Sequence, residues 1–261
     1  MKLPKNISKK KILGISLVVV FLVVLLVLGG GLFWWQSGTY LPSSNSLSTI
    51  SSTISIQDKG SYIQLSNPLK TDTDKVGIVF YPGARIDPSA YKTLLSKIPE
   101  TSNSKVFIAK FPLNLAILGV NAGDQIIKDN SDITSWYIAG HSLGGAMISE
   151  YLKGTKYESK INGVIYMGAY PNDDYLLNKK YKILSLYGSE DKLTTPEKID
   201  SSKSKLPSSS LFIQLPSNHS QFGDYGHQEG DGNQILDTDS VHTRIIEIIR
   251  EFIGQPKSFL S

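Results

Sequence analysis

The stretch Gly140-His141-Ser142-Leu143-Gly144-Gly145 constrains the fold of this chain more than any other feature of its sequence. An apolar run over residues 133–139 precedes it, and a pattern typical of a helix, residues 146–152, follows it. A strand, the pattern Gly-x-Ser-x-Gly and a helix form a nucleophile elbow, a turn so tight that the serine adopts strained backbone angles. The small neighbours of Ser142 let the strand and the helix approach without a clash. The same pattern also occurs in ordinary glycine-rich turns, so the rest of the chain decides its meaning.

Composition excludes several kinds of protein. The chain has 261 residues, a formal charge of +4 and no cysteine, so disulfides, thiol catalysis and cysteine-ligated metals are excluded. Much of the positive charge comes from lysines near the N-terminus, and the remainder is close to neutral, which does not favour nucleic-acid binding. We expect no cofactor and no metal.

An apolar segment, residues 12–35, follows the lysines of residues 1–11. As a helix it would be about 36 Å long at 1.5 Å per residue, enough to cross a bilayer. Trp34 and Trp35 end it with an aromatic pair typical of a membrane interface. We expect a single-pass anchor in the cell membrane, with residues 1–11 in the cytoplasm and the rest outside. A cleaved signal peptide is the alternative, although no Ala-x-Ala site follows the segment.

Residues 36–55 are rich in serine and threonine, which predicts a flexible stalk. Beyond it, over residues 56–261, short apolar runs alternate with helical patterns. This alternation predicts an α/β domain in three layers, with a mostly parallel sheet covered by helices on both faces. We expect strands at 53–57, 62–65, 76–81, 106–109, 133–139, 161–167, 181–187 and 211–215, and helices at 88–98, 117–128, 146–152, 196–204 and 240–253.

Partners of Ser142 should directly follow strands, because ligands bind beyond the carboxyl ends of the strands in such sheets. They should also come in the chain order serine, acid, histidine. Asp191 directly follows an expected strand and is the candidate acid. Glu190, Asp173 and Asp174 are the alternatives.

His219 directly follows the last expected strand and is the candidate base. His227, further along the same loop, is the alternative. His141 is too close to the serine in sequence to fold back onto it, and His242 is expected in solvent on the last helix. With this set, His219 would accept the proton of the serine, and Asp191 would orient the imidazole.

Two backbone amides are expected to stabilise an oxyanion. Leu143 begins the helix after the elbow, so its amide points to the site. Ala84 is the second candidate donor, in the loop after strand 76–81, where Gly83 permits unusual backbone angles and is expected to contact substrate. Lys110 follows the next strand and either contacts an anionic group of the substrate or is solvated.

These segments together resemble the α/β-hydrolase superfamily, and within it the small single-domain branch called alpha/beta hydrolase fold-5, which is similar to the dienelactone hydrolases. The resemblance covers about residues 76–253. It rests on Phe80-Tyr81-Pro82-Gly83-Ala84, Lys110-Phe111-Pro112-Leu113-Asn114, Gly140-His141-Ser142-Leu143-Gly144-Gly145, Tyr187-Gly188-Ser189-Glu190-Asp191 and Asn218-His219-Ser220-Gln221-Phe222-Gly223-Asp224-Tyr225-Gly226. The resemblance implies the fold and the triad, and no particular substrate. True dienelactone hydrolases use a cysteine where this chain has Ser142, so that activity does not carry over.

Two loops also bear on the site. The glycine-rich stretch 222–232 is either a rim of the site or a calcium loop with Asp224, Glu229 and Asp231, whose spacing does not match an EF-hand. We favour the rim, since long loops at strand ends usually shape pockets. Many lipases insert a large cap in the connection that falls here at 170–181, which is too short for one, so no large lid is expected.

The sequence therefore predicts an anchored extracytoplasmic serine hydrolase, and most simply a carboxylesterase that acts through an acyl-enzyme on small or polymer-attached esters. One alternative is a catalytically silent α/β-hydrolase fold used for binding at the cell surface. Another is an acyltransferase with the same triad. A binding protein has no need of all three side chains, which favours an enzyme.

Overall fold

The computed structural model describes residues 21, 31, 37–44, 50–70 and 76–254. Contacts divide the chain into two units, Met1–Thr39 and Tyr40–Ser261. The predicted span over 12–35 lies outside the described residues except for Phe21 and Gly31, which are both helical. Among the described residues, no helix combines the length and the hydrophobicity that crossing a bilayer requires. The anchor and its cytoplasmic N-terminus therefore remain predictions.

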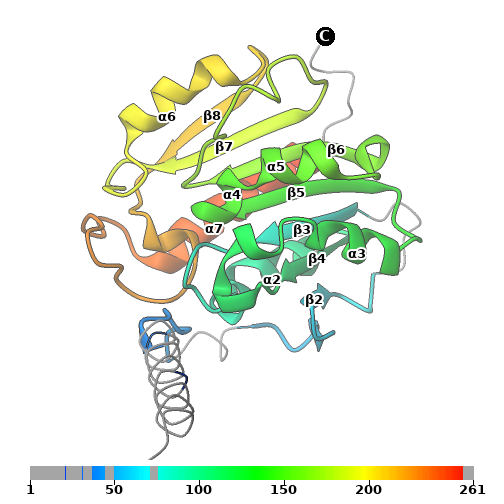
Figure 1. Ribbon diagram of the computed structural model, residues 1–261. Coiled ribbons are helices and arrows are strands. Elements are labelled where there is room, and N and C mark those ends of the chain that lie inside the picture. Colours follow the sequence, from blue (N-terminus) through cyan, green and yellow to red (C-terminus); the bar gives the residue numbers. More distant parts are fainter. Residues whose placement is uncertain (1–20, 22–30, 32–36, 45–49, 71–75, 255–261) are drawn as a thin grey trace, which may run out of the picture. The chain divides into compact units, whose positions relative to one another are not determined.

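The second unit is built on a sheet that has eight strands within the described residues, in the order β1-β2-β4-β3-β5-β6-β7-β8 (Figure 1). The strands are β1 (Ser55–Asp58), β2 (Tyr62–Ser66), β3 (Val76–Tyr81), β4 (Ser104–Ala109), β5 (Ser135–His141), β6 (Ile161–Met167), β7 (Lys182–Gly188) and β8 (Leu211–Leu215). The α-helices are α2 (Lys92–Thr101), α3 (Ala122–Asp129), α4 (Leu143–Ala146), α5 (Ile148–Gly154), α6 (Pro196–Ser202) and α7 (Thr238–Gly254).

Strands β3 to β8 run parallel to one another, whereas β2 pairs antiparallel with both β1 and β4. The carboxyl ends of β3 to β8 therefore meet at one edge of the sheet, where ligands bind in parallel α/β folds. The predicted three-layer α/β fold is confirmed.

Successive side chains along each strand point to alternate faces of the sheet, so the core has one part on each face. Ile78 and Phe80 pack on the face covered by α2 and α7, whereas Val79 and Tyr81 pack on the face covered by α3 and α5. Successive side chains of a strand point to opposite faces, so a strand buried on both faces must be apolar throughout. This explains the continuous apolar runs in the sequence.

The predicted helix over 117–128 is wrong in its first part. The structure has a short 3-10 helix, η4 (Ala116–Leu118), which ends at Gly119, and α3 begins only at Ala122. Gly119 has backbone angles outside the helical region (φ −157°, ψ 39°). Glycine loses more conformational freedom in a helix than any other residue, which is why the pattern breaks there.

The predicted flexible stalk over 36–55 is not free along its whole length. The Tyr40 amide donates to the Arg85 carbonyl at 2.7 Å, and the Asp87 amide donates to the Tyr40 carbonyl at 2.9 Å. The Tyr40 ring also lies 5.6 Å from the Tyr225 ring, centre to centre. The domain therefore begins at Tyr40 rather than at residue 56, because an aromatic side chain and two backbone hydrogen bonds attach this segment to it.

Candidate active site

Ser142 lies between β5 and α4 with φ 50° and ψ −124°. A positive φ is rare for a residue other than glycine and costs about 1–3 kcal/mol, so it persists only where the surroundings impose it. The predicted strained turn is present, and it presents Ser142 at the carboxyl edge of the sheet.

The glycines around Ser142 permit the close packing that holds this turn. A Cβ on Gly140 would lie 2.7 Å from the Gly145 amide nitrogen, and one on Gly144 would lie 2.1 Å from the Tyr81 carbonyl oxygen. Real Cβ atoms do not approach backbone atoms so closely. Glycine is therefore required at these positions for steric reasons, as the motif predicts.

The Asp191 and His219 side chains meet in the interior, behind the carboxyl ends of β7 and β8. The His219 Nδ1 lies 2.7 Å from the Asp191 Oδ2, and both side chains are almost completely buried. The other Asp191 oxygen accepts hydrogen bonds from the amides of Leu193 at 2.9 Å and Thr194 at 2.6 Å. Because a carboxylate accepts, His219 donates from Nδ1.

The alternative residues are placed differently. Asp173 forms an ion pair with Lys153, and Glu190 accepts a hydrogen bond from the Ser189 hydroxyl. His227 is exposed on the loop after β8. Of the candidate acids and bases, the structure joins Asp191 to His219 through a hydrogen bond.

The His219 ring lies against the elbow that carries Ser142. Its centre is 4.5 Å from the centre of the His141 ring, the residue before the serine. The Ser142 amide donates to the Met167 carbonyl at 3.2 Å, and a Cβ on the next residue, Gly168, would lie 3.2 Å from the His219 Nδ1. Within the described residues no hydrogen bond joins the Ser142 hydroxyl to His219; such contacts are often long in a free enzyme and shorten with substrate.

The loop after β8 is held by Asp231. Its carboxylate accepts hydrogen bonds from the amides of His219 at 3.0 Å, Ser220 at 2.8 Å and Gly232 at 2.7 Å. The Asn218 side chain donates to the Gly232 carbonyl at 2.9 Å, which closes the loop. Asp231, considered in the sequence as a possible calcium ligand, thus fixes the backbone that carries His219.

The backbone amides of the two predicted oxyanion donors, Ala84 and Leu143, differ from the Gly83 amide in their hydrogen bonding. The Gly83 amide donates to the Tyr91 hydroxyl at 3.0 Å, so it is occupied. The Ala84 amide has no hydrogen bond within the described part of the chain. Leu143 is the first residue of α4, and the first amides of a helix lack partners inside it. The amides of Ala84 and Leu143 are therefore both available to a ligand.

A buried pair links this loop to the elbow. The Tyr91 hydroxyl, which accepts from Gly83, lies 2.8 Å from the His141 Nδ1. Burial holds the pKa of His141 well below its usual value of 6.5, and the neighbouring His219 lowers it further. The Tyr91 hydroxyl thus joins the Gly83 amide to the buried His141 ring. The sequence contains no signal for this contact, because it joins residues distant along the chain.

Two further predictions have different outcomes. The Lys110 ammonium lies 2.9 Å from the Asp58 carboxylate, so its charge is paired with β1. Its contact with substrate stays a prediction. His242 was expected in solvent but is buried, and its Nε2 donates to the Gly223 carbonyl at 3.1 Å. The α7 helix presents His242 to the core rather than to water, and burial lowers its pKa.

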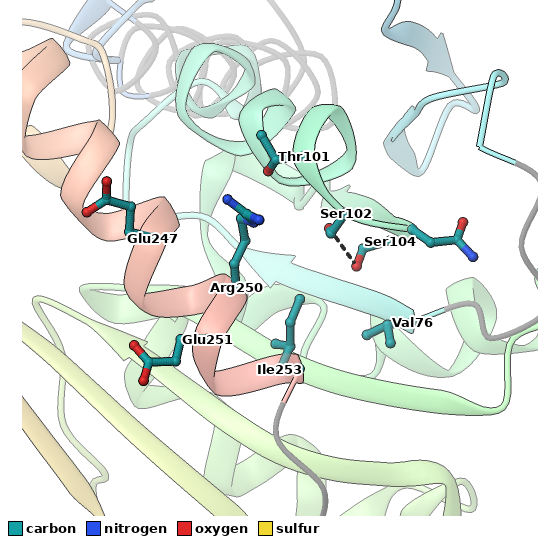
Figure 2. A pocket seen from close by; sticks show the side chains of 10 residues that line it. Val76, Thr101, Ser102, Ser104, Glu247, Arg250, Glu251 and Ile253 are labelled. Atoms are coloured by element: carbon teal, nitrogen blue, oxygen red, sulfur yellow. Dashed lines mark hydrogen bonds between the residues drawn. The ribbon is translucent and has the colours of Figure 1, made fainter.

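A cavity of about 480 Å³ lies at the other edge of the sheet (Figure 2). Val76 and Ser104, the first residues of β3 and β4, line it together with Arg250 and Glu251 of α7. Because these strands are parallel, their starts lie at the edge opposite to Ser142. The cavity therefore takes no part in the candidate site.

Comparison with known proteins agrees with this architecture. A model of the alpha/beta hydrolase family matches residues 77–242. A search of curated proteins finds no significant match. A dienelactone hydrolase from Anabaena variabilis has a similar structure, with a TM-score of 0.56 at 11% identity over 77% of this chain and 97% of its own.

Two other solved structures are similar. A soluble variant of monoglyceride lipase from Saccharomyces cerevisiae gives a TM-score of 0.56 at 11% identity, over 81% of this chain and 99% of its own. A predicted CIB-like hydrolase from Thermoplasma acidophilum gives 0.54 at 15% identity, over 76% of this chain and 99% of its own. At such low identity these similarities support the fold, and the activities belong to those proteins.

Proposed function

Since the chain belongs to the alpha/beta hydrolase family, we propose that it is a serine hydrolase, and specifically a carboxylesterase with the triad Ser142, His219 and Asp191. The observation that carries this proposal is the buried 2.7 Å contact between His219 and Asp191, beside a serine in a strained elbow. A catalytically silent fold would have no need to keep a carboxylate and an imidazole together in the interior.

The reaction follows from the hydrogen bonds. His219 accepts the Ser142 proton at Nε2 while Asp191 stabilises the imidazolium through Nδ1. The serine oxygen attacks the ester carbonyl carbon, and His219 then donates the proton to the leaving alcohol. Water, activated by the same imidazole, releases the carboxylic acid from Ser142. The amides of Leu143 and Ala84 would stabilise the negative charge on the carbonyl oxygen in both steps.

The connection between β6 and β7, residues 168–181, contains turns and no helix or strand. The proposed site is therefore open, which favours small or polymer-attached esters over bulk lipid. A fluorophosphonate probe tests the serine hydrolase directly, because it labels an activated serine. Failure to label the folded chain would favour a silent binding protein. If the chain is labelled and, in a separate assay without the probe, transfers acyl groups from esters to an acceptor other than water, an acyltransferase would be favoured.

Tyr91 should affect the rate through the oxyanion loop. In Tyr91→Phe, the Gly83 amide and the His141 Nδ1 lose their shared partner, so the loop that carries Ala84 is held less firmly. We expect kcat to fall about tenfold with little change in KM, because an oxyanion contact strengthens in the transition state. Two buried polar groups without partners should also lower the free energy of unfolding by about 1–3 kcal/mol.

Tyr137→Phe is the matched control, because this tyrosine is buried on the face covered by α7 and its hydroxyl lies 3.5 Å from the Ile253 carbonyl. Steady-state kinetics and thermal unfolding of both variants separate the two effects. A Tyr91→Phe variant that loses stability but keeps its kcat would show that the pair is structural only.

The lysines of residues 1–11 and the apolar segment 12–35 support an anchor that leaves the catalytic domain outside the cell membrane. The full chain should then remain in the membrane fraction after an alkaline carbonate wash, and protease added to intact cells should cleave the domain. Release by carbonate would contradict the anchor. A shortened mature chain in the medium would indicate a cleaved signal peptide instead.

A further inference from the structure

Three large apolar side chains are exposed on the loop after β4. Leu113 is 38% exposed, Ile117 60% and Leu118 52%. Single exposed leucines are common on protein surfaces, but a group within one short loop beside a candidate site indicates a binding surface. We refer to these three residues as the apolar shelf.

The shelf adjoins the proposed catalytic machinery. Ile117 and Leu118 belong to η4, which packs against α4, the helix that begins after Ser142. Leu113 precedes Asn114, whose carbonyl accepts the Arg85 amide at 3.0 Å, and Arg85 directly follows the proposed oxyanion donor Ala84. The segment that carries the shelf therefore adjoins both α4 and the loop of Ala84, the two elements that would hold the ester carbonyl.

The loop that carries the shelf is fixed rather than free. Leu113 and Asn114 both have positive φ, 55° and 54°. The Asn114 amide donates to the Phe111 carbonyl at 3.1 Å, and Phe111 is itself buried. Ala116 is 1% exposed and attaches η4 to the core. Leu113 is thus held in a strained backbone conformation while its apolar side chain stays partly exposed, which points to a function for that side chain.

The sheet order decides which end of an ester would lie there. In the order β4-β3-β5-β6-β7-β8, the shelf follows β4 on one side of Ser142, whereas His219 follows β8 on the other. The leaving alcohol must lie toward His219, because that imidazole protonates it. The acyl group then extends in the opposite direction, toward β4.

We propose that the apolar shelf binds the hydrocarbon chain of the acyl group, which makes medium-chain acyl esters the preferred substrates. The inference rests on the proposed function and adds the acyl specificity to it. An open shelf accommodates such a chain without a lid, because burying each methylene against leucine and isoleucine removes apolar surface from water.

The test compares p-nitrophenyl acetate with p-nitrophenyl octanoate, below its micelle concentration, on the full chain. In the double variant Ile117→Ser with Leu118→Ser, kcat/KM for the octanoate should fall about tenfold or more, while the acetate stays within about twofold. Both side chains are exposed, so the fold should be retained. Leu69→Ser is the matched control, an exposed leucine in the β2–β3 connection at the opposite edge of the sheet.

Other outcomes overturn the proposal in distinct ways. Equal losses on both esters, or no loss on either, would refute the shelf while leaving the esterase intact. A selective loss on octyl acetate instead of the octanoate would assign the shelf to the alcohol group and refute the acyl assignment. A wild-type chain that hydrolyses none of these esters and resists phosphonate labelling would refute the serine hydrolase, and the shelf with it.

Discussion

Replacing Ser142 with alanine should reduce ester hydrolysis on the order of 10⁴–10⁶-fold and abolish fluorophosphonate labelling. Ser142 is the proposed nucleophile, and the amides of Leu143 and Ala84 can bind an oxyanion but cannot attack a carbonyl. The small activity that remains would come from these amides and from substrate binding. The measurements are the steady-state kinetics of hydrolysis of one ester and the extent of fluorophosphonate labelling, both on the purified full chain.

Ser201→Ala is the matched control, because this serine is exposed on α6. It should keep full activity and full labelling. Alanine has a Cβ, as serine does, so the positive φ at position 142 strains both residues to a similar degree. The variant should therefore keep the fold of the wild type. A Ser142→Ala variant that still hydrolyses esters at the wild-type rate would refute the proposed mechanism.

Replacing His219 should produce a loss of similar size, on the order of 10³–10⁶-fold in kcat. His219→Ala would leave the Asp191 carboxylate buried without its partner, which is strongly destabilising. His219→Asn avoids this difficulty, because its side-chain amide still donates toward Asp191 but cannot accept and return a proton. We expect His219→Asn to fold as the wild type and to be inactive by ester kinetics.

His227→Asn provides the comparison, because His227 was the rival base in the sequence and is exposed in the structure. It should retain wild-type kcat and KM. The reverse result, an active His219→Asn variant and an inactive His227→Asn variant, would move the general base to residue 227 and require a rearrangement of the loop after β8.

The geometry around Ser142 was predictable because it is local. The strand, the serine and the glycines are consecutive in sequence, and the close contacts of Gly140 and Gly144 with backbone atoms leave no room for a side chain. The pairing of Asp191 with His219 was predictable for a different reason. Parallel strands bring their carboxyl ends to one edge, so side chains that follow β7 and β8 meet there.

Other parts of the site could not be predicted. Tyr91, at the start of α2, was assigned no role, yet its hydroxyl joins the Gly83 amide to the His141 ring. Tyr40 was predicted to lie in a flexible stalk, yet it is hydrogen bonded to the Arg85 backbone. In both cases the partner is remote along the chain, and neither residue belongs to a pattern that marks such a contact.

The chain by itself determined the fold class, the position of the strained serine and the order of the acid and the base, because these follow from hydrophobic periodicity and from sterics among neighbouring residues. Tertiary structure alone decided which amides remain free beside Ser142, that Lys110 pairs with Asp58, and that η4, with the exposed Ile117 and Leu118, packs against α4. These outcomes depend on distances between segments that only packing brings together, and no local rule of sequence specifies them.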